Sequence, residues 1–234
     1  LNAGPSGGTG IFFYQWEQSP DNSVWSSAPG GSASAAYDPQ ALTATTHYHR
    51  VVTSGACVDV SAPVTVTILP AITNNIVAAD QTICEGTQFA NLTGSAPGGG
   101  AAPTYTYQWM SSTDNAIWSP AAGTNSTSGY DVQNDDPGTT YFRRMVYSGL
   151  NNTCQSTSNT VTMVAHPSIT NNIISADQTI CEGASPATID GTLPANGAGP
   201  GTYTYQWMSS NNGSTFTSMT GSVAEDLPGT PLTA

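Results

Sequence analysis

The chain has 234 residues, only 8% of them charged, and its 15 acids, three arginines and no lysine give a formal net charge of −12. Nucleic-acid binding and a polybasic membrane anchor are excluded, because both need clustered basic side chains facing phosphates. Hydrophobic residues make up 38% of the chain, enough for packed cores, and no apolar run approaches the roughly 18 residues of a membrane span.

The elements predicted along the chain are short strands separated by turns. Strands are expected in runs rich in Thr, Tyr, Val and aromatic residues, at Val64–Ile68, Thr104–Trp109, Tyr141–Tyr147 and Asn159–Ala165. The first run alternates apolar and polar residues, as a strand with one buried face does. Turn signals lie between the runs, at Ala28–Gly31, Pro97–Gly100, Asp136–Gly138 and Pro200–Gly201. No stretch is typical of a helix, so an all-β sandwich is predicted.

Three segments of the sequence recur almost unchanged. Ile72–Ile76 returns as Ile169–Ile173, and Asp80–Gly86 as Asp177–Gly183, each 97 residues later. The segment Tyr105–Ser112 also recurs, as Tyr203–Ser210. Solenoid and propeller repeats run about 20–50 residues, whereas an immunoglobulin-like sandwich has about 100. The spacing therefore predicts tandem immunoglobulin-like β-sandwich modules.

The repeats divide the chain into three expected modules. Module 1 comprises residues 1–69 and lacks the first strands of the repeat, module 2 comprises residues 70–166 and is complete, and module 3 comprises residues 167–234 and lacks the last strands. We expect the 234 residues to be a window on a longer polypeptide.

Two sets of aromatic residues recur with the repeat. One set follows Tyr-Gln on the third-strand position and is expected in the core between two sheets: Trp16, Trp109 and Trp207. The other comes nine residues later, on the next strand, where an exposed ring would form a platform for a ligand such as a sugar: Trp25, Trp118 and Phe216.

Four cysteines in so polar a chain suggest disulfides made outside the cytoplasm. Cys84 and Cys154 flank Trp109 within module 2 and are expected to form an intradomain disulfide, whereas Cys57 and Cys181 would pair with cysteines outside the chain. A rival connectivity, Cys57–Cys84 and Cys154–Cys181, would join adjacent modules across each linker. No two cysteines form a CxxC pair, so a zinc site is not expected.

Metal and cofactor sites have weak candidates. His47 and His49 have the spacing of a metal-binding pair on one strand face, but their module 2 counterparts are Tyr141 and Arg143, so no metal is expected there. No cofactor is expected. The alternative is calcium bound at one of two acid pairs, which are otherwise expected to be solvated: Asp135–Asp136 and Glu225–Asp226.

The sequence contains few residues in arrangements that suit catalysis. The three histidines do not recur beside a serine or cysteine, so we expect no catalytic residues and no enzyme activity. What recurs on that strand is an aromatic residue at 48 and 142, an arginine at 50 and 144, and a valine at 52 and 146. These residues share one face and indicate a structural stripe.

Most of the chain resembles a known repeat family, through Leu42–Cys57, Ile72–Gly86, Tyr105–Trp118 and Ile169–Trp207. The resemblance is to immunoglobulin-like repeats of large secreted surface proteins and adhesins of Bacteroidota, many exported by the type IX secretion system. It implies an extracellular, cell-surface location and no catalytic residues. His47 and His49 depart from the family's usual pattern, which affects only local surface chemistry.

Two hypotheses for function follow from the sequence. The first is a structural repeat of an extracellular stalk, filament or adhesin, whose partners are neighbouring modules; the linkers Pro70–Asn75 and Pro167–Asn172 share one motif and predict junctions of one geometry. The second is a carbohydrate-binding or adhesive module that uses outward-facing aromatics to bind surface glycans. A third, strand addition, would let separate chains complete each other's modules.

Overall fold

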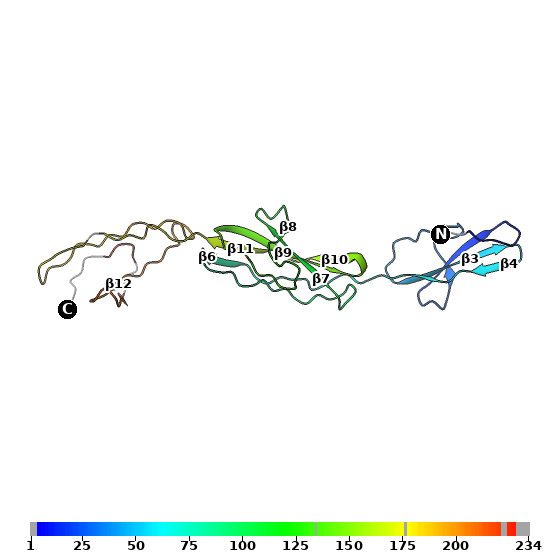
Figure 1. Cartoon of the computed structure of the whole chain (residues 1–234), viewed down its shortest axis with the longest axis horizontal. Coiled ribbons are helices and arrows are strands. Elements are labelled where there is room, and N and C mark those ends of the chain that lie inside the picture. Colours follow the sequence, from blue (N-terminus) through cyan, green and yellow to red (C-terminus); the bar gives the residue numbers. More distant parts are fainter. Residues whose placement is uncertain (1–3, 134, 176, 221–223, 228–234) are drawn as a thin grey trace. The chain divides into compact units, whose positions relative to one another are not determined.

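The computed structural model describes residues 4–133, 135–175, 177–220 and 224–227 (Figure 1). Its described elements are thirteen strands and one short 3-10 helix, Leu150–Asn152, arranged in three sheets. The prediction of tandem immunoglobulin-like β-sandwich modules is confirmed. Residues up to Thr73 form one compact unit with Pro97–Tyr105 and Tyr147–Ser156, and the other described residues form a second.

The first sheet belongs to module 1. It contains β1 (Phe13–Ser19), β2 (Ser26–Ser27), β3 (Thr46–Ser54), β4 (Cys57–Val60) and β5 (Val64–Val66). The order is β2-β1-β3-β4, with β5 also paired to β3. All pairs are antiparallel, and β1 and β3 face each other over seven residues. β4 begins opposite Ser54, where β3 ends, whereas β5 ends opposite Thr46, where β3 begins.

The second sheet belongs to module 2. It contains β6 (Gln81–Cys84), β7 (Thr106–Ser112), β8 (Ser119–Pro120), β9 (Gly138–Ser148), β10 (Cys154–Thr157) and β11 (Val161–His166). The order is β6-β11-β9-β7-β8, with β10 paired to β9. β11 runs antiparallel to β9 and parallel to β6. The first and last strands of the repeat therefore lie side by side.

The third sheet is small, and the bridges around it follow the repeat. β12 (Met208–Ser209) and β13 (Thr217–Ser218) pair over two residues. Three isolated bridges of module 2 recur 97 residues later in module 3: Thr73–Gly98 as Thr170–Ala195, Val77–Gly94 as Ile174–Gly191, and Leu92–Tyr130 as Ile189–Leu227. The same local sequence thus folds the same way twice.

The core of module 2 follows the two-residue period of its strands. Burial alternates along β11, where Val161, Met163 and Ala165 are buried and the residues between them are half-buried. These side chains pack with others of the buried cluster: Val77, Phe89, Leu92, Trp109, Ala121, Tyr130, Val132 and Phe142. The ring of Tyr130 lies 5.7 Å from that of Trp109 and 5.4 Å from that of Phe142, within the range of favourable aromatic pairs.

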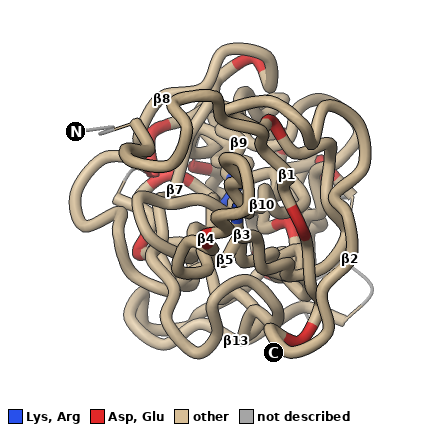
Figure 2. The backbone as a smooth tube through the Cα atoms, turned by 90° about the vertical axis from the view of Figure 1, so that its right-hand side faces the viewer, with Lys and Arg blue, Asp and Glu red and all other residues tan. Residues whose placement is uncertain are grey.

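Charges are sparse over this fold. Acidic residues are spread over many segments of the backbone (Figure 2). Among the described residues, no helix is long and apolar enough to cross a membrane.

Candidate functional site

A buried arginine joins several segments of module 2 through hydrogen bonds. Arg144 lies on the inward face of β9 between Phe142 and Val146, and it is fully buried. Its guanidinium donates three hydrogen bonds: Nε to Asn75 Oδ1 at 3.0 Å, Nη1 to the Ser128 carbonyl at 2.9 Å, and Nη2 to the Ser95 carbonyl at 2.8 Å. These acceptors replace the water that burial removes. Burial nevertheless lowers the pKa of Arg144 from its ordinary value.

Two residues, Asn75 and Gly94, are important for holding the Arg144 side chain in this position. Asn75 holds both ends of the residue, because its Nδ2 also donates to the Arg144 carbonyl at 3.2 Å. Gly94 lies so close that a Cβ there would overlap the guanidinium. The Tyr107 ring forms another wall, with its centroid 5.2 Å from Cζ of Arg144. We call Asn75, Gly94, Ser95 and Tyr107 the arginine seat.

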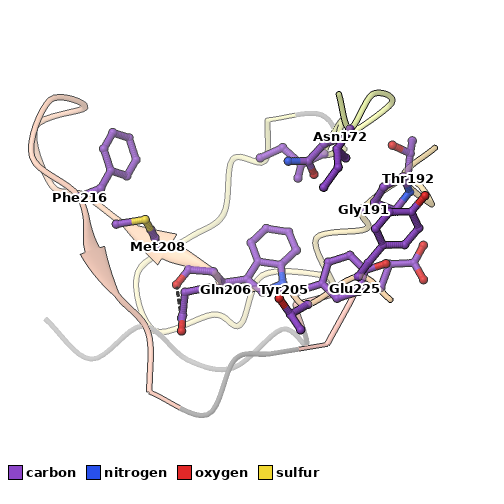
Figure 3. A pocket seen from close by; sticks show the side chains of 14 residues that line it. Asn172, Gly191, Thr192, Tyr205, Gln206, Met208, Phe216 and Glu225 are labelled. Atoms are coloured by element: carbon purple, nitrogen blue, oxygen red, sulfur yellow. Dashed lines mark hydrogen bonds between the residues drawn. The ribbon is translucent and has the colours of Figure 1, made fainter. Parts of the chain in front are cut away.

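Residues equivalent to the arginine seat recur in module 3. The counterparts are Asn172, Gly191, Thr192 and Tyr205, and they line a hollow of about 380 Å³. Figure 3 shows Asn172, Gly191 and Thr192 at one side of this hollow and Met208 and Phe216 at the other. Ile174, which also lines this hollow, is 59% exposed, whereas its counterpart Val77 is 2% exposed.

Module 1 contains the counterpart of the buried arginine. Arg50, the counterpart of Arg144, donates from Nη1 to the Ala35 carbonyl at 2.8 Å and lies over the rings of Tyr14 and Trp16. Residues 1–69 contain no counterpart of Asn75 or Gly94. The inward-facing residues of β5 and its continuation are exposed where their module 2 counterparts are buried: Val64, Val66 and Ile68 against Val161, Met163 and Ala165.

The three tryptophans expected in the core share one hydrogen-bonded position. The indole Nε1 donates to a backbone carbonyl at 3.0 Å in each module, to Ser34 from Trp16, to Thr127 from Trp109 and to Ala224 from Trp207. Trp109 is fully buried, and the other two are half-buried.

The residues expected to form a ligand platform have partners in two of the modules. Arg143 lies over the Trp118 ring, with Cζ 4.1 Å from its centroid, and His49 stacks on Trp25 at 3.6 Å. Phe216 in module 3 is 52% exposed. In modules 1 and 2, a neighbouring side chain therefore covers one face of the ring.

Two of the histidines and one of the acids lie within hydrogen-bonding distance of neighbouring groups. His49 Nε2 lies 2.7 Å from Glu17 Oε2, and His47 Nδ1 lies 2.9 Å from Thr65 Oγ1. Asp226 accepts a hydrogen bond from the Gly191 amide at 2.9 Å. Within the described ranges, no three His, Cys, Asp or Glu side chains gather as a metal site would need.

The cysteines require a correction. All four are free thiols in the structure, so the expected Cys84–Cys154 bond is absent. Cys84 lies opposite His166, beside the start of β9, because Ala165 pairs with Gly138. Cys154 begins β10, which follows the end of β9 after a short turn. A strand rises about 3.3 Å per residue, so the 11 residues of β9 separate the two thiols far beyond the roughly 7 Å limit between bonded Cα atoms.

The rival connectivity within one chain fails for a related reason. Cys57 pairs with Ser54 at the end of β3, whereas β5 leads into the next module from the start of β3. Cys57 therefore lies at the end of its sheet that is remote from the linker. Its counterpart Cys154 is likewise remote from the linker that follows β11.

Comparison with known proteins identifies the repeat. The sequence model of a family described as a domain of unknown function (DUF8696) matches residues 2–70, 73–167 and 170–234. The chain belongs to this family. No curated protein matches the chain.

Two solved structures are similar to the three DUF8696 repeats. One is a crystal structure of human CDH23 EC21-23, at 14% identity and a TM-score of 0.31, covering 86% of this chain and 74% of that one. The other contains Sidekick-1 immunoglobulin domains 1–4, at 12% identity and a TM-score of 0.30. That match covers 94% of this chain, which spans 56% of the Sidekick-1 chain.

A serine–acid turn follows the tryptophan strand in modules 1 and 2, and module 3 has an asparagine in place of the acid. In module 2, Asp114 Oδ1 accepts hydrogen bonds from the amides of Ile117 and Ala116, both at 2.8 Å, and from Ser112 Oγ at 2.9 Å. These donors stabilise the carboxylate and hold the pKa of Asp114 below its ordinary value. Asp21 has the same partners in module 1, and Asn212 takes the place in module 3.

Proposed function

We propose that the chain is a non-catalytic structural segment of an extracellular stalk, filament or adhesin on a bacterial surface. The observation that carries the proposal is the parallel pairing of β6 with β11, the first and last strands of the module 2 sheet. The extracellular, bacterial setting rests on the resemblance of the repeats to secreted surface proteins.

Parallel pairing of terminal strands suits a module that is pulled at its two ends. Tension draws β6 back toward its own beginning and β11 forward toward its own end. Because the strands are parallel, the pull slides one along the other and loads all of their hydrogen bonds together. Four residue pairs, from Gln81–Met163 to Cys84–His166, make up this contact. Asp80 adds a bond outside the ladder, since its Oδ1 accepts from the Thr162 amide at 2.8 Å.

The repetition of local structure supports the same role. Each of the three isolated bridges of module 2 recurs in module 3, and the linker motif of Pro70–Asn75 recurs at Pro167–Asn172. Asn74 and Asn171 of this motif both adopt a left-handed backbone, with φ of 55° and 60°. A spacer benefits from such uniform units, because its length then depends only on their number.

Single-molecule pulling of the full chain tests the proposal. We expect module 2 to unfold in one high-force step that releases roughly 3.3–3.6 Å per residue. The amide of Ile83 faces β11, because the Glu85 amide two residues on donates to the His166 carbonyl. Ile83→Pro should therefore abolish the high-force step. The matched control is Ile180→Pro in module 3, at the equivalent position, where the described structure assigns no strand to residues 178–181. Low-force unfolding of the wild type would refute the proposal.

A second candidate function is carbohydrate binding, as an adhesive module. It is favoured by the exposed ring of Phe216 and by the half-buried Trp25 and Trp118 at equivalent places. Flat aromatic rings of this kind stack on sugars. Binding to a glycan array that disappears with Trp118→Ala would support this function, and binding that survives the change would exclude this platform.

A further inference from the structure

One arginine side chain of module 2 donates no hydrogen bond to the described residues. Arg143 lies on the outward face of β9, beside the inward-facing Arg144. Its Nε is buried without an acceptor, and its guanidinium forms no hydrogen bond or ion pair with the described part of the chain. The other two arginines, Arg50 and Arg144, both donate to carbonyl oxygens. A buried donor without an acceptor is uncommon in proteins, so Arg143 needs an explanation.

The neighbour of this guanidinium is an aromatic ring. Cζ of Arg143 lies 4.1 Å from the centroid of the Trp118 ring, which is itself half-buried. Such a ring attracts the cation and holds it in place, but it offers no acceptor atom in exchange for water. Because Nε is the buried nitrogen, the two Nη groups are the donors that an incoming molecule can reach.

The equivalent place in module 1 contains a carboxylate. His49 and Trp25 are the counterparts of Arg143 and Trp118, and their ring centroids are 3.6 Å apart. Glu17 faces His49 across β1 and β3, and its Oε2 lies 2.7 Å from His49 Nε2. Module 1 therefore brings together a nitrogen donor, an aromatic ring and a carboxylate.

Module 2 has the donor and the ring but an apolar residue in place of the acid. Met110 is the counterpart of Glu17, because each directly follows Tyr-Gln-Trp. Its strand, β7, lies beside β9 in the sheet, and Met110 faces Pro120 of β8 on the other side. Residues directly opposite each other on neighbouring strands share a face of the sheet. The surface next to Arg143 is therefore apolar where module 1 has its own carboxylate.

We propose that Arg143 and Trp118 bind a uronic acid residue of a glycan. The sugar carboxylate accepts hydrogen bonds from the two Nη groups of Arg143, in the two-pronged geometry that a guanidinium and a carboxylate favour. The C–H groups of the sugar ring pack on the exposed part of Trp118 and on the apolar surface of Met110 and Pro120. This inference deepens carbohydrate binding, the second candidate function, and rests on it.

The charge and shape of this surface favour an isolated acidic sugar. Arg143 and Arg144 supply two of the three arginines of a chain with a net charge of −12, and acidic residues are spread over many segments (Figure 2). A polymer with an acid on every unit would meet that negative charge, whereas one uronic acid residue meets the arginine alone. A peptide carboxylate would gain the charge contact only, while a pyranose ring adds a rigid apolar face.

Nuclear magnetic resonance of the full chain gives a direct readout of the site. With three arginines in the chain, an isotope-labelled sample should show three Nε–Hε signals. The probes are cellobiouronic acid and cellobiose, which differ in one carboxylate. We expect the acidic disaccharide to shift one of these signals and to bind at least about tenfold more tightly than the neutral one. Its affinity should fall with added salt, which screens the charge contact.

Two variants test the assignment to this arginine. Arg143→Gln should lower the affinity for the acidic disaccharide to that for the neutral one. Met110→Glu should do the same, because it places the carboxylate of module 1 beside Arg143. The matched control is Arg50→Gln, which removes an arginine that donates to the Ala35 carbonyl and should leave binding unchanged. Preference for the acidic sugar that survives Arg143→Gln or Met110→Glu would overturn the proposal. Near-ultraviolet circular dichroism checks that the variants are folded.

The other outcomes distinguish this inference from the candidate function on which it rests. Equal binding of the two disaccharides that is lost in Trp118→Ala would leave carbohydrate binding standing and reject recognition of the acid. Tighter binding of a triglutamate peptide than of the acidic disaccharide would identify a protein ligand and overturn the sugar. Failure of both disaccharides to bind at millimolar concentration would reject the inference together with this platform.

Discussion

Arg144 and Asn75 are joined by two hydrogen bonds in opposite directions: Nε of Arg144 donates to Oδ1 of Asn75 at 3.0 Å, and Nδ2 of Asn75 donates to the Arg144 carbonyl at 3.2 Å. The pair ties β9 to a segment 69 residues earlier. These two bonds thereby hold β9, which contributes side chains to the core, against the first residues of module 2.

Replacement of this arginine should cost module 2 much of its stability. Arg144→Met keeps most of the volume but removes the hydrogen bonds that the guanidinium donates to Asn75 Oδ1 and to the Ser95 and Ser128 carbonyls, so we expect a loss of roughly 3–5 kcal/mol. Arg143→Met changes the adjacent residue, whose guanidinium lies over Trp118 on the other face, and should cost about 0.5–1 kcal/mol. Urea denaturation monitored by near-ultraviolet circular dichroism measures both. Equal losses would contradict the seat described for Arg144.

Replacement of the two tryptophans of module 2 by alanine should reduce its stability by different amounts. Trp109 is fully buried, so Trp109→Ala should destabilise the module by about 3–5 kcal/mol through the cavity it leaves. Trp118→Ala should cost about 1 kcal/mol, since that ring is only half-buried and contacts Arg143. Thermal unfolding of each variant gives the comparison. A larger loss for Trp118 than for Trp109 would reverse our assignment of the core.

The serine–acid turns should make stability depend on pH below about 4. The pKa of Asp114 is lowered by hydrogen bonds from the Ile117 and Ala116 amides and from Ser112. The stabilisation is therefore present above the unfolded-state pKa of about 3.9 and is lost as pH falls through the lower folded pKa. Asp114→Asn keeps an acceptor oxygen, as Asn212 does in module 3, and cannot titrate. Unfolding free energies measured from pH 6 to pH 2 should fall less steeply in this variant than in the wild type.

Thiol titration separates the observed cysteine arrangement from the expected one. Three of the four cysteines are exposed and Cys154 is half-buried, so all four should react with a thiol reagent in dilute native protein. A stoichiometry of two would indicate a Cys84–Cys154 bond and an arrangement of strands different from the one described. The melting temperature of the dilute chain should accordingly be unchanged by a reducing agent.

The sequence was sufficient for those parts of the fold that depend on local pattern. The two-residue alternation in Val64–Ile68 and the recurrence of Tyr-Gln-Trp indicate sandwich strands, since each strand side faces one environment. Local sequence pattern could not predict the parallel pairing of β6 with β11. It joins Gln81 to Met163, and no local feature determines which strands meet across that distance.

The errors and omissions at the candidate site have the same origin. Cys84 and Cys154 flank Trp109 in the sequence, but sequence position does not show which end of the sheet a residue occupies. Arg144 recurs with Arg50 and was assigned to a structural stripe, yet its burial depends on Asn75 and Gly94. Those residues lie 69 and 50 positions away. Their own counterparts, Asn172 and Gly191, recur at the repeat spacing and were the available signal.

Because a side chain at Gly94 would overlap the guanidinium of Arg144, the two positions are expected to change together during evolution. A sister repeat that replaces the glycine should also have exchanged its arginine for a smaller residue, and should then have no use for the asparagine at position 75. The three positions form a fingerprint by which divergent copies can be sorted into those that inherited the seat and those that rebuilt this part of the interior.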